Sequence, residues 1–387
     1  MDRSADILMD MIRYAVFDPD ASSITSEPIS DATLVELYML AKRHRLAGLV
    51  GHALETQNLL KDSSVSSLFR KEMFNEIYHY EKLNFTYQML CEALENGQIA
   101  FLPLKGTVLR RYYPQPWMRT SCDIDILVHE NDIPRAEAVL TSALGFEKSG
   151  GTTYDISFYS KDGVHMELHY ELIEHNRAGK ASQVLEQIWE HAIPVQDGSY
   201  RHKLDDAMFY FYHIAHMAKH FESSGCGIRM FLDLSLLMER TKNSRSQIEV
   251  LLRESCLLTF DRVACELCRA WFLGKEYTTN SLRLANVILD SGTFGTRENS
   301  YITGKKRHGG TAGYLLSRVF LPYKTLKKLY PVIEKWPILI PICVIHRACL
   351  FLFGRKRVRL QEYFRATKSD VTAKAENIAD VLDIVGL

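Results

Sequence analysis

FLPLKGTVLRRYYPQPWMRTSCDIDILV, residues 101–128, is the stretch that decides the fold. From Cys122 to Val128, apolar residues occupy every second position, which is the period-two pattern of a β-strand. Side chains two residues apart leave a strand on the same face, so Asp123 and Asp125 point together. Two adjacent carboxylates repel each other unless a cation lies between them. Mg²⁺ is the natural cation, because it prefers oxygen ligands and is commonly held by one or two carboxylates together with substrate phosphates.

A Lys-Gly pair precedes the two aspartates. Lys105 and Gly106 follow an apolar run, 99–104, and lead into a helix-like stretch. A strand that turns into a helix at Lys-Gly presents a lysine, a closely approaching backbone and a positive helix end to an anion. The segment therefore predicts a metal-binding end and a phosphate-binding end.

These residues resemble a known family. LPLKGTVLRRYYPQPWMRTSCDIDILV is similar to the motif block of uncharacterised nucleotidyltransferase-like proteins of the polymerase-β superfamily, which have Lys-Gly, an aromatic-Pro segment, an Arg and then Asp-x-Asp on a strand. The likeness continues in HMELHYEL (165–172) and HMAKHFESSGCGIRMFLDLSLL (216–237), and more weakly across 287–350. One departure is that Lys105-Gly106 stands where the wider superfamily opens its phosphate loop with Gly-Ser.

The resemblance implies roles for the motif residues. Asp123 and Asp125 would bind Mg²⁺, with Mn²⁺ as the alternative cation, while Lys105, Gly106 and Arg119 would hold the phosphates of a nucleoside triphosphate (NTP). The structural alternative is that the aspartates bond to loop amides or to Arg119. Phosphoryl-type transfer depends mostly on positioning and charge neutralisation, which these residue types supply.

A third carboxylate is expected on a neighbouring strand. In VHMELHY (164–170), the phase of the alternation places His165, Glu167 and His169 on the polar face. Glu167 is thus the candidate to complete the metal site or to deprotonate an acceptor hydroxyl. Many relatives of the superfamily carry Asp here, and Asp155 and Glu171 are the competing carboxylates.

A histidine stripe follows in the C-terminal half. His213, His216 and His220 share one helical face, where they could bind zinc, face a nucleotide or be satisfied core residues. The apolar surroundings favour the core interpretation. Arg229 and Asp233, one turn apart, could pair with each other or join these histidines.

Composition limits the function classes. The 387 residues include 47 basic and 47 acidic side chains, so there is no overall positive charge of the kind that extended DNA binding requires. Residues 1–20 lack the uninterrupted apolar core of a signal peptide. Eight scattered cysteines fit a reducing cytoplasm, and Cys265 and Cys268 fit core packing better than a metal site. We therefore expect a cytoplasmic protein.

Three regions are expected. Residues 1–98 predict a helical region, 99–204 a mixed-sheet catalytic core of α+β class with a small polymerase-β-like sheet and helices on one face, and 205–387 a second helical region with a loop near 291–310. The apolar segment 336–353 contains Pro341, His346 and Arg347, which predicts a buried or surface-lying helix rather than a membrane span. The basic residues at 355–359 leave peripheral membrane contact through this region as an alternative.

The sequence thus favours an Mg²⁺-dependent nucleotidyltransferase that moves a nucleoside monophosphate from an NTP to an acceptor and releases pyrophosphate. The alternative is a nucleotide- or partner-binding protein on a degenerate transferase fold. The acceptor, which could be a small molecule, a protein or a tRNA, is not specified by the sequence, and neither are the base preference and the oligomeric state.

Overall fold

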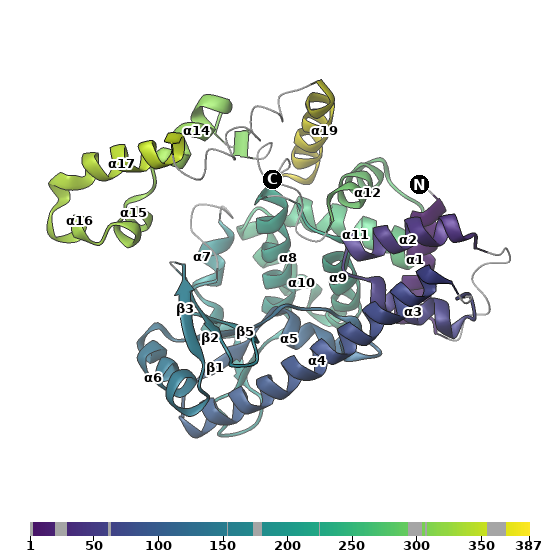
Figure 1. Ribbon diagram of the computed structural model, residues 1–387, viewed down its shortest axis with the longest axis horizontal. Coiled ribbons are helices and arrows are strands. Elements are labelled where there is room, and N and C mark those ends of the chain that lie inside the picture. The colour runs from purple at the N-terminus through teal and green to yellow at the C-terminus, as the bar shows by residue number, and fades with distance from the viewer. Residues whose placement is uncertain are drawn as a thin grey trace.

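Within the part of the chain that the structure describes, a five-stranded mixed β-sheet carries the Asp-x-Asp stretch. The computed structural model describes residues 3–19, 29–60, 63–152, 154–172, 180–223, 225–292, 304–305, 308–353 and 369–387. Helices precede the sheet in the sequence, and more helices follow it (Figure 1). The predicted α+β class, a small mixed sheet flanked by two helical regions, is confirmed.

The order of the strands places the two motif strands side by side. The strands are β1 (Phe101–Pro103), β2 (Asp123–Val128), β3 (Glu147–Gly151), β4 (Asp155–Tyr159) and β5 (His165–His169), in the spatial order β1-β2-β5-β4-β3. β2 and β5 run parallel, and all other neighbours in this sheet are antiparallel. The sequence predicts strands over 99–104, 122–128, 156–160 and 164–170, but not β3, an exposed edge strand whose sequence EKSGG has no apolar alternation.

One face of the sheet is apolar and is covered by helices. Ile124 and Ile126 of β2 pack with Met166 and Leu168 of β5 in a core that also receives Leu90 of the long helix α4. The N-terminal helices are α1 (Arg3–Val16), α2 (Asp31–Arg43), α3 (Ala47–Thr56) and α4 (Ser64–Asn96). The short elements around the motif strands are α5 (Lys105–Leu109), η1 (Arg110–Tyr112), η2 (Pro116–Met118), η3 (Glu130–Asp132), α6 (Ile133–Ala138) and the π-helical turn η4 (Val139–Ala143).

The C-terminal helices lie across the other, polar face, so the sheet has helices on both sides rather than on one as predicted. Asp205 caps α8, because its Oδ1 accepts a hydrogen bond from the backbone N–H of Met208. Cys265 and Cys268 are buried in the helical core, as predicted. The elements of this part are α7 (Ala181–Leu185), η5 (Ile188–His191), β6 (Ala192–Pro194), β7 (His202–Leu204), α8 (Asp206–Ser223), α9 (Ile228–Arg240), η6 (Lys242–Ser244), α10 (Arg245–Glu254), α11 (Leu258–Phe272), α12 (Thr279–Ser291) and α19 (Ser369–Val385).

Four further helices form a separate hairpin that stands away from the rest of the molecule (Figure 1). They are α14 (Thr311–Val319), α15 (Tyr323–Leu329), α16 (Val332–Lys335) and α17 (Ile340–Phe353), with the turn η7 (Pro337–Leu339) before α17. The predicted helix over 336–353 is therefore present and lies at the surface. Most of the predicted loop at 291–310 lies outside the described residues. None of the described helices combines the length and the apolar composition that crossing a bilayer requires.

Candidate active site

Asp123, Asp125 and Glu167 lie together on the polar face of the sheet. The parallel register of β2 and β5 sets Asp125 opposite Glu167 and Asp123 opposite His165. Within the described chain, two groups of side chains each bring their ligand atoms within 4.8 Å of one another: Asp123, His165 and Glu167, and Asp125, Glu167 and His169. Glu167 belongs to both groups, and this shared position makes it the carboxylate that links the two aspartates.

The competing carboxylates belong to neither group among the described residues. Asp155 accepts hydrogen bonds from the backbone N–H of Thr152 at 3.2 Å and from its hydroxyl at 2.5 Å. This pattern closes the turn before β4, so Asp155 has a local structural role. Glu171 lies beyond the end of β5. The geometry therefore favours Glu167 over both.

Asp125 is a buried, paired carboxylate. Its Oδ1 accepts a hydrogen bond from Nζ of Lys105 at 2.7 Å and lies 2.8 Å from Nε2 of His169. Burial raises the pKa of Asp125, but the charge of Lys105 and the contact with His169 outweigh burial and hold this pKa below its ordinary value. The reciprocal effect of Asp125 holds the pKa of Lys105 above its ordinary value despite burial. The two groups are therefore an ion pair at neutral pH.

Asp123 is different, because its carboxylate makes no hydrogen bond or ion pair with any described residue. Burial and the neighbouring charge of Asp125 raise the pKa of Asp123. A half-buried carboxylate beside two others, with no cation of its own, is an oxygen-rich site that lacks positive charge. This donor set fits Mg²⁺ or Mn²⁺, since hard divalent cations prefer carboxylate oxygens.

The Lys-Gly pair forms a tight turn at the edge of this site. Lys105 has a positive φ of 46°, an uncommon conformation for a residue with a side chain. A Cβ on Gly106 would lie 2.5 Å from Nη1 of Arg119 and 2.9 Å from Cβ of Ser121, so only glycine fits here without displacement. The helix that follows, α5, has only five residues. The helix end at which an anion site was expected therefore belongs to a helix of little more than one turn. The ammonium group of Lys105 binds Asp125.

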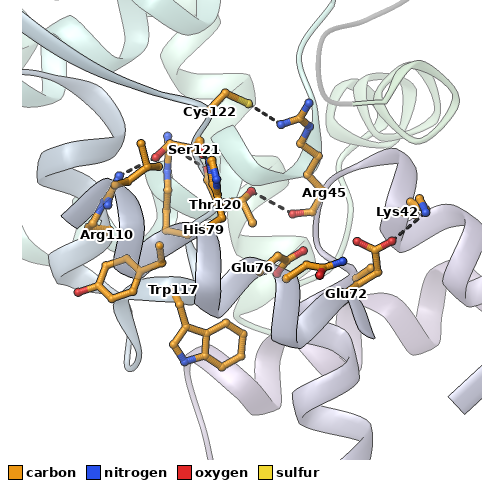
Figure 2. Close-up of a pocket in the computed structure, with 15 residues that line it drawn as sticks. Lys42, Arg45, Glu72, Glu76, His79, Arg110, Trp117, Thr120, Ser121 and Cys122 are labelled. Atoms are coloured by element: carbon orange, nitrogen blue, oxygen red, sulfur yellow. Dashed lines mark hydrogen bonds and ion pairs between the residues drawn. The ribbon is translucent and has the colours of Figure 1, made fainter. Parts of the chain in front are cut away.

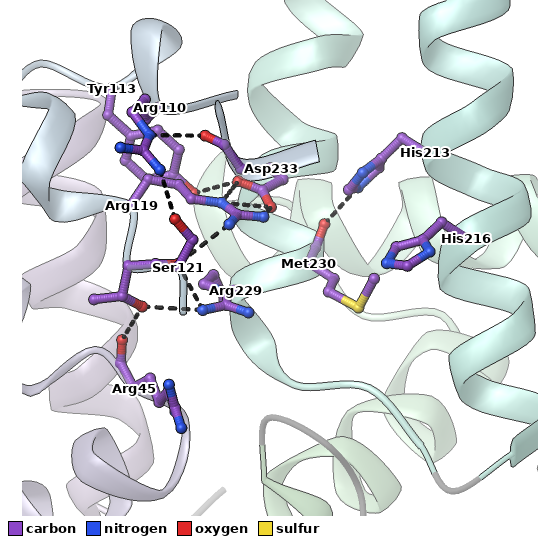
Figure 3. A network of polar contacts seen from close by, with 12 residues as sticks. Arg45, Arg110, Tyr113, Arg119, Ser121, His213, His216, Arg229, Met230 and Asp233 are labelled. Carbon is purple, nitrogen blue, oxygen red and sulfur yellow. Dashed lines mark hydrogen bonds and ion pairs between the residues drawn. The ribbon is translucent and has the colours of Figure 1, made fainter. Parts of the chain in front are cut away.

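Arg119 is buried in a salt bridge with Asp233. Nη2 of Arg119 donates to Oδ2 of Asp233 at 2.8 Å, and Tyr113 donates its hydroxyl to Oδ1 of the same carboxylate at 2.7 Å (Figure 3). Two pairings that the sequence left open are therefore absent among the described contacts. They are an ion pair between Arg119 and Asp123 and an ion pair between Arg229 and Asp233. Arg229 instead donates to the backbone carbonyl of Thr120 at 2.7 Å.

The histidines of α8 line the opposite side of the same space. His213 Nε2 lies 2.9 Å from the carbonyl oxygen of Met230, and Nε2 of His216 lies 3.1 Å from Nε2 of His220. Burial, together with the charge of Lys105, lowers the pKa of His220 to about 4, and burial lowers the pKa of His216 well below its ordinary value. Both rings are therefore neutral at pH 7. Neither belongs to a group with metal-ligand geometry within the described chain.

These side chains surround one cavity of about 250 Å³. Its lining includes most of the predicted site residues, namely Lys105, Gly106, Arg119, Asp123, Asp125, Glu167, His216, His220 and Arg229. Two predicted residues do not line the cavity but contact residues that do: His169 contacts Asp125, and Asp233 binds Arg119. The cavity joins a carboxylate face to a face of neutral rings.

Residues 30–273 match the model of a family described as uncharacterised nucleotidyltransferase. The chain belongs to this family. The matched range contains α2–α4, the whole sheet and α8–α11, and it ends before α12. No curated protein and no solved structure matches the chain. Family membership supports a nucleotidyltransferase activity and a nucleotide substrate; enzymes of this kind generally use a divalent metal, which the cluster of carboxylates and histidines could bind.

Tyr212 lines the cavity but was not predicted as a site residue from the sequence. Its hydroxyl is buried at the cavity without a hydrogen-bond partner among the described residues. Tyr212, His216 and His220 are spaced four residues apart on α8. The helical spacing that predicted a shared face for the histidines therefore also places Tyr212 on that face. Ser121 and Cys122, which precede β2, also line the cavity and were not predicted as site residues.

A second cavity of about 390 Å³ adjoins the first (Figure 2). The two cavities share Arg119, Ser121 and Cys122 as lining residues. Arg110 stiffens the shared wall, since it donates to the hydroxyl of Ser121 at 2.6 Å and to the carbonyl oxygen of Gly106 at 3.0 Å. The remaining lining comes mainly from the N-terminal helices α2, α3 and α4 and from the segment between α5 and β2.

Proposed function

We propose that the protein transfers a nucleoside monophosphate from an NTP to an acceptor and releases pyrophosphate. The proposal rests on one observation: three carboxylates on two adjacent parallel strands face a common cavity, and one of them, Asp123, has no cationic partner among the described residues. Structural carboxylates in proteins are normally paired or hydrogen-bonded when they are partly buried. Asp123 departs from that rule at the place where the family would bind metal.

Each carboxylate is assigned a part in this proposal. Asp123, Asp125 and Glu167 would hold Mg²⁺ or Mn²⁺, which when bound neutralises charge on the nucleotide phosphates. The free oxygen of Asp125, Oδ2, and both oxygens of Asp123 are available, because Lys105 and His169 contact only Oδ1. His169 lies 3.3 Å from Oε2 of Glu167 and orients that carboxylate. Lys105 is the cavity-lining cation nearest to the carboxylates and would contact a phosphate oxygen as well as Asp125.

Glu167 is also assigned the role of general base for the acceptor hydroxyl. An acceptor hydroxyl would attack the α-phosphorus, the bond from that phosphorus to the bridging oxygen would break, and pyrophosphate would leave. The hydroxyl proton would pass to Glu167, whose side chain is about a quarter exposed at the cavity. Arg119, buried against Asp233, is assigned a positioning role on the wall between the two cavities instead of a direct phosphate contact.

A second function is favoured by the Lys105–Asp125 ion pair. The ammonium group already neutralises one of the expected metal ligands at 2.7 Å. A protein that used this lysine in place of a metal could bind a nucleotide without turning it over. This is the nucleotide-binding alternative on a degenerate transferase fold.

The deciding experiment incubates the protein with each α-labelled NTP, Mg²⁺ and a cell lysate as a source of acceptors. We expect label to move into an acceptor in the presence of Mg²⁺ and not in EDTA, with Asp123→Asn inactive. Equilibrium binding of each NTP is measured in parallel. Tight NTP binding that is independent of Mg²⁺, without transfer of any label, would establish the binding alternative.

A further inference from the structure

The α14–α17 hairpin has its own small core and lies outside the range that matches the nucleotidyltransferase family. Leu326, Ile333 and Cys343 are buried at its centre. Arg347 on α17 reaches back to the hairpin, where its Nε donates to the carbonyl oxygen of Arg318 at 2.9 Å. The inner face of α17 is therefore already occupied by the hairpin itself.

The outer face of the hairpin is apolar and exposed. Ile338, Ile342 and Ile345 are 82%, 61% and 63% exposed, and their spacing of four and three residues places them on one side of η7 and α17. Phe320 and Trp336 are also more than half exposed. Soluble proteins rarely expose so many large apolar side chains on one small element, and such patches mark interaction sites.

The same segment is strongly basic. Residues 311–353 contain six lysines and arginines and one acidic residue, whereas the whole chain has equal numbers of both signs. The single acid, Glu334, is paired with Lys327. The sequence continues with Arg355, Lys356, Arg357 and Arg359. Apolar side chains next to an excess of positive charge match the chemistry of an anionic lipid surface.

The described residues of this hairpin contain no helix long and apolar enough to cross a bilayer. α17 has 14 residues, and a span needs about 20. Pro337 begins the turn η7 before α17, Pro341 lies in the first turn of α17, and the side chain of Arg347 is bonded inside the hairpin. A short helix of this kind lies along a membrane surface with its apolar side chains in the interfacial layer.

We propose that the α14–α17 hairpin docks on a membrane that contains anionic lipids. Ile338, Ile342 and Ile345 enter the interface, Trp336 lies at the level of the head groups, and the basic side chains meet lipid phosphates. This surface is separate from the proposed transfer site, so it stands whether or not the protein turns over nucleotide. It would hold the transfer domain close to a lipid surface.

The experiment is co-sedimentation of the full-length protein with vesicles of phosphatidylcholine alone or of phosphatidylcholine with phosphatidylglycerol at 3:1. We expect binding to the anionic vesicles that weakens as salt is raised, and little binding to the neutral ones. Ile342→Asp/Ile345→Asp should reduce partitioning by about tenfold or more, because two carboxylates would enter the apolar layer. The matched control, Val250→Asp/Leu282→Asp, changes two exposed apolar residues of the main body and should leave binding unchanged.

A charge variant tests the electrostatic part without touching the hairpin core. Lys335→Glu, at an exposed position, should lower binding to the anionic vesicles by about tenfold. The circular dichroism spectrum of this variant should match that of the parent protein. Failure of the parent protein to bind anionic vesicles would overturn the proposal. So would a concentration-dependent dimer that Ile342→Asp/Ile345→Asp abolishes, because the face would then be an interface between copies.

Discussion

Nζ of Lys105 lies 2.7 Å from Oδ1 of Asp125, and together they join the turn after β1 to the centre of β2. The carboxylate is 4% exposed and the lysine side chain 22%. The predicted phosphate ligand and a predicted metal ligand are thus one ion pair. Asp125 is therefore part of the internal structure of the site, while Asp123 is the carboxylate still open to a ligand.

The first prediction concerns this pair. Lys105→Ala leaves Asp125 buried without its ammonium partner, so the free energy of unfolding at pH 7 should fall by about 3–5 kcal/mol. The pKa of Asp125 is held below its ordinary value in the folded protein. The pair therefore stabilises the fold fully at a pH above the ordinary pKa, and this stabilisation is lost as the pH falls towards the lowered pKa. Urea unfolding of both single variants and of Lys105→Ala/Asp125→Ala gives a double-mutant cycle. The double variant should lose less than the sum of the single losses, and strict additivity would show that the pair contributes no coupling energy.

The second prediction separates Asp123 from Asp125. Asp123→Asn should abolish Mg²⁺-dependent NTP binding and leave stability unchanged or raised, since Asp123 has no protein partner among the described residues to lose. Asp125→Asn should lower stability as well, because it weakens the contacts with Lys105 and His169. Calorimetric titration with Mg·ATP and thermal unfolding measure the two effects. Asp162→Asn, in the exposed β4–β5 turn, is the matched control, and Asp123→Asn that bound Mg·ATP like the parent would remove Asp123 from the metal site.

The third prediction concerns Gly106. Gly106→Ala would push Arg119, which is anchored by Asp233, and Ser121, which is anchored by Arg110. We expect a loss of about 1–3 kcal/mol in the free energy of unfolding, the range for overpacking a filled site. The control is Gly97→Ala, another glycine without a positive φ, where an added Cβ would lie 3.2 Å from the nearest atom and should cost less. Equal losses at both positions would show that contact with Arg119 is unimportant.

How much of this site could be foreseen depends on the type of signal. Alternation in DIDILV and HMELH identifies β2 and β5 and tells which side chains share a face, because the strand period is a local property. The same rule with helical spacing places His213, His216 and His220 on one face of α8. These local signals predict the carboxylates and histidines of the cavity lining, whereas Lys105, Gly106 and Arg119 were predicted from the Lys-Gly pair and the family resemblance.

Partners in space were harder to foresee. Arg119 and Asp233 are 114 residues apart, and nothing in the period of either element says which charge meets which. The local alternatives, Arg119 with Asp123 and Arg229 with Asp233, were both wrong, because the packing of α9 against the loop before β2 brings Asp233 to Arg119. β3 was missed for a related reason: an exposed edge strand with two glycines is held by its pairing with β4, which its own sequence does not encode.

The fourth prediction is a pH dependence at Glu76 on α4. Oε1 of Glu76 accepts a hydrogen bond from the backbone N–H of Gly48, its Oε2 is buried without a partner among the described residues, and burial raises the pKa of this carboxyl to about 8. The unfolded chain ionises near pH 4.5 while the folded protein stays protonated up to about pH 8, so the group reduces stability progressively across that window. Glu76→Gln should remove this loss, worth about 1–3 kcal/mol.

Urea unfolding at pH 5 and pH 8 measures the Glu76 effect. The parent should lose stability relative to Glu76→Gln on going from pH 5 to pH 8. Glu81→Gln, at an exposed position of the same helix, is the control and should follow the parent. Parallel behaviour of the parent and Glu76→Gln would show that Glu76 ionises normally in the folded protein.

The last prediction separates an enzyme from a binder and depends on Glu167. This carboxylate is opposite Asp125 in the parallel register, shares ligand geometry with both aspartates and lies 3.3 Å from His169. In the proposed mechanism, Asp123 and Asp125 would hold the cation on the triphosphate, whereas accepting the proton of the acceptor would need a further carboxylate on the adjacent strand. Glu167→Gln should therefore keep most of the NTP affinity and lower turnover by about 10²-fold or more. Glu147→Gln on the exposed strand β3 is the matched control and should retain full activity. Transfer at the parental rate in Glu167→Gln would show that Glu167 is not the general base. Equal losses of NTP affinity and turnover would indicate that Glu167 is a metal ligand without a role as base.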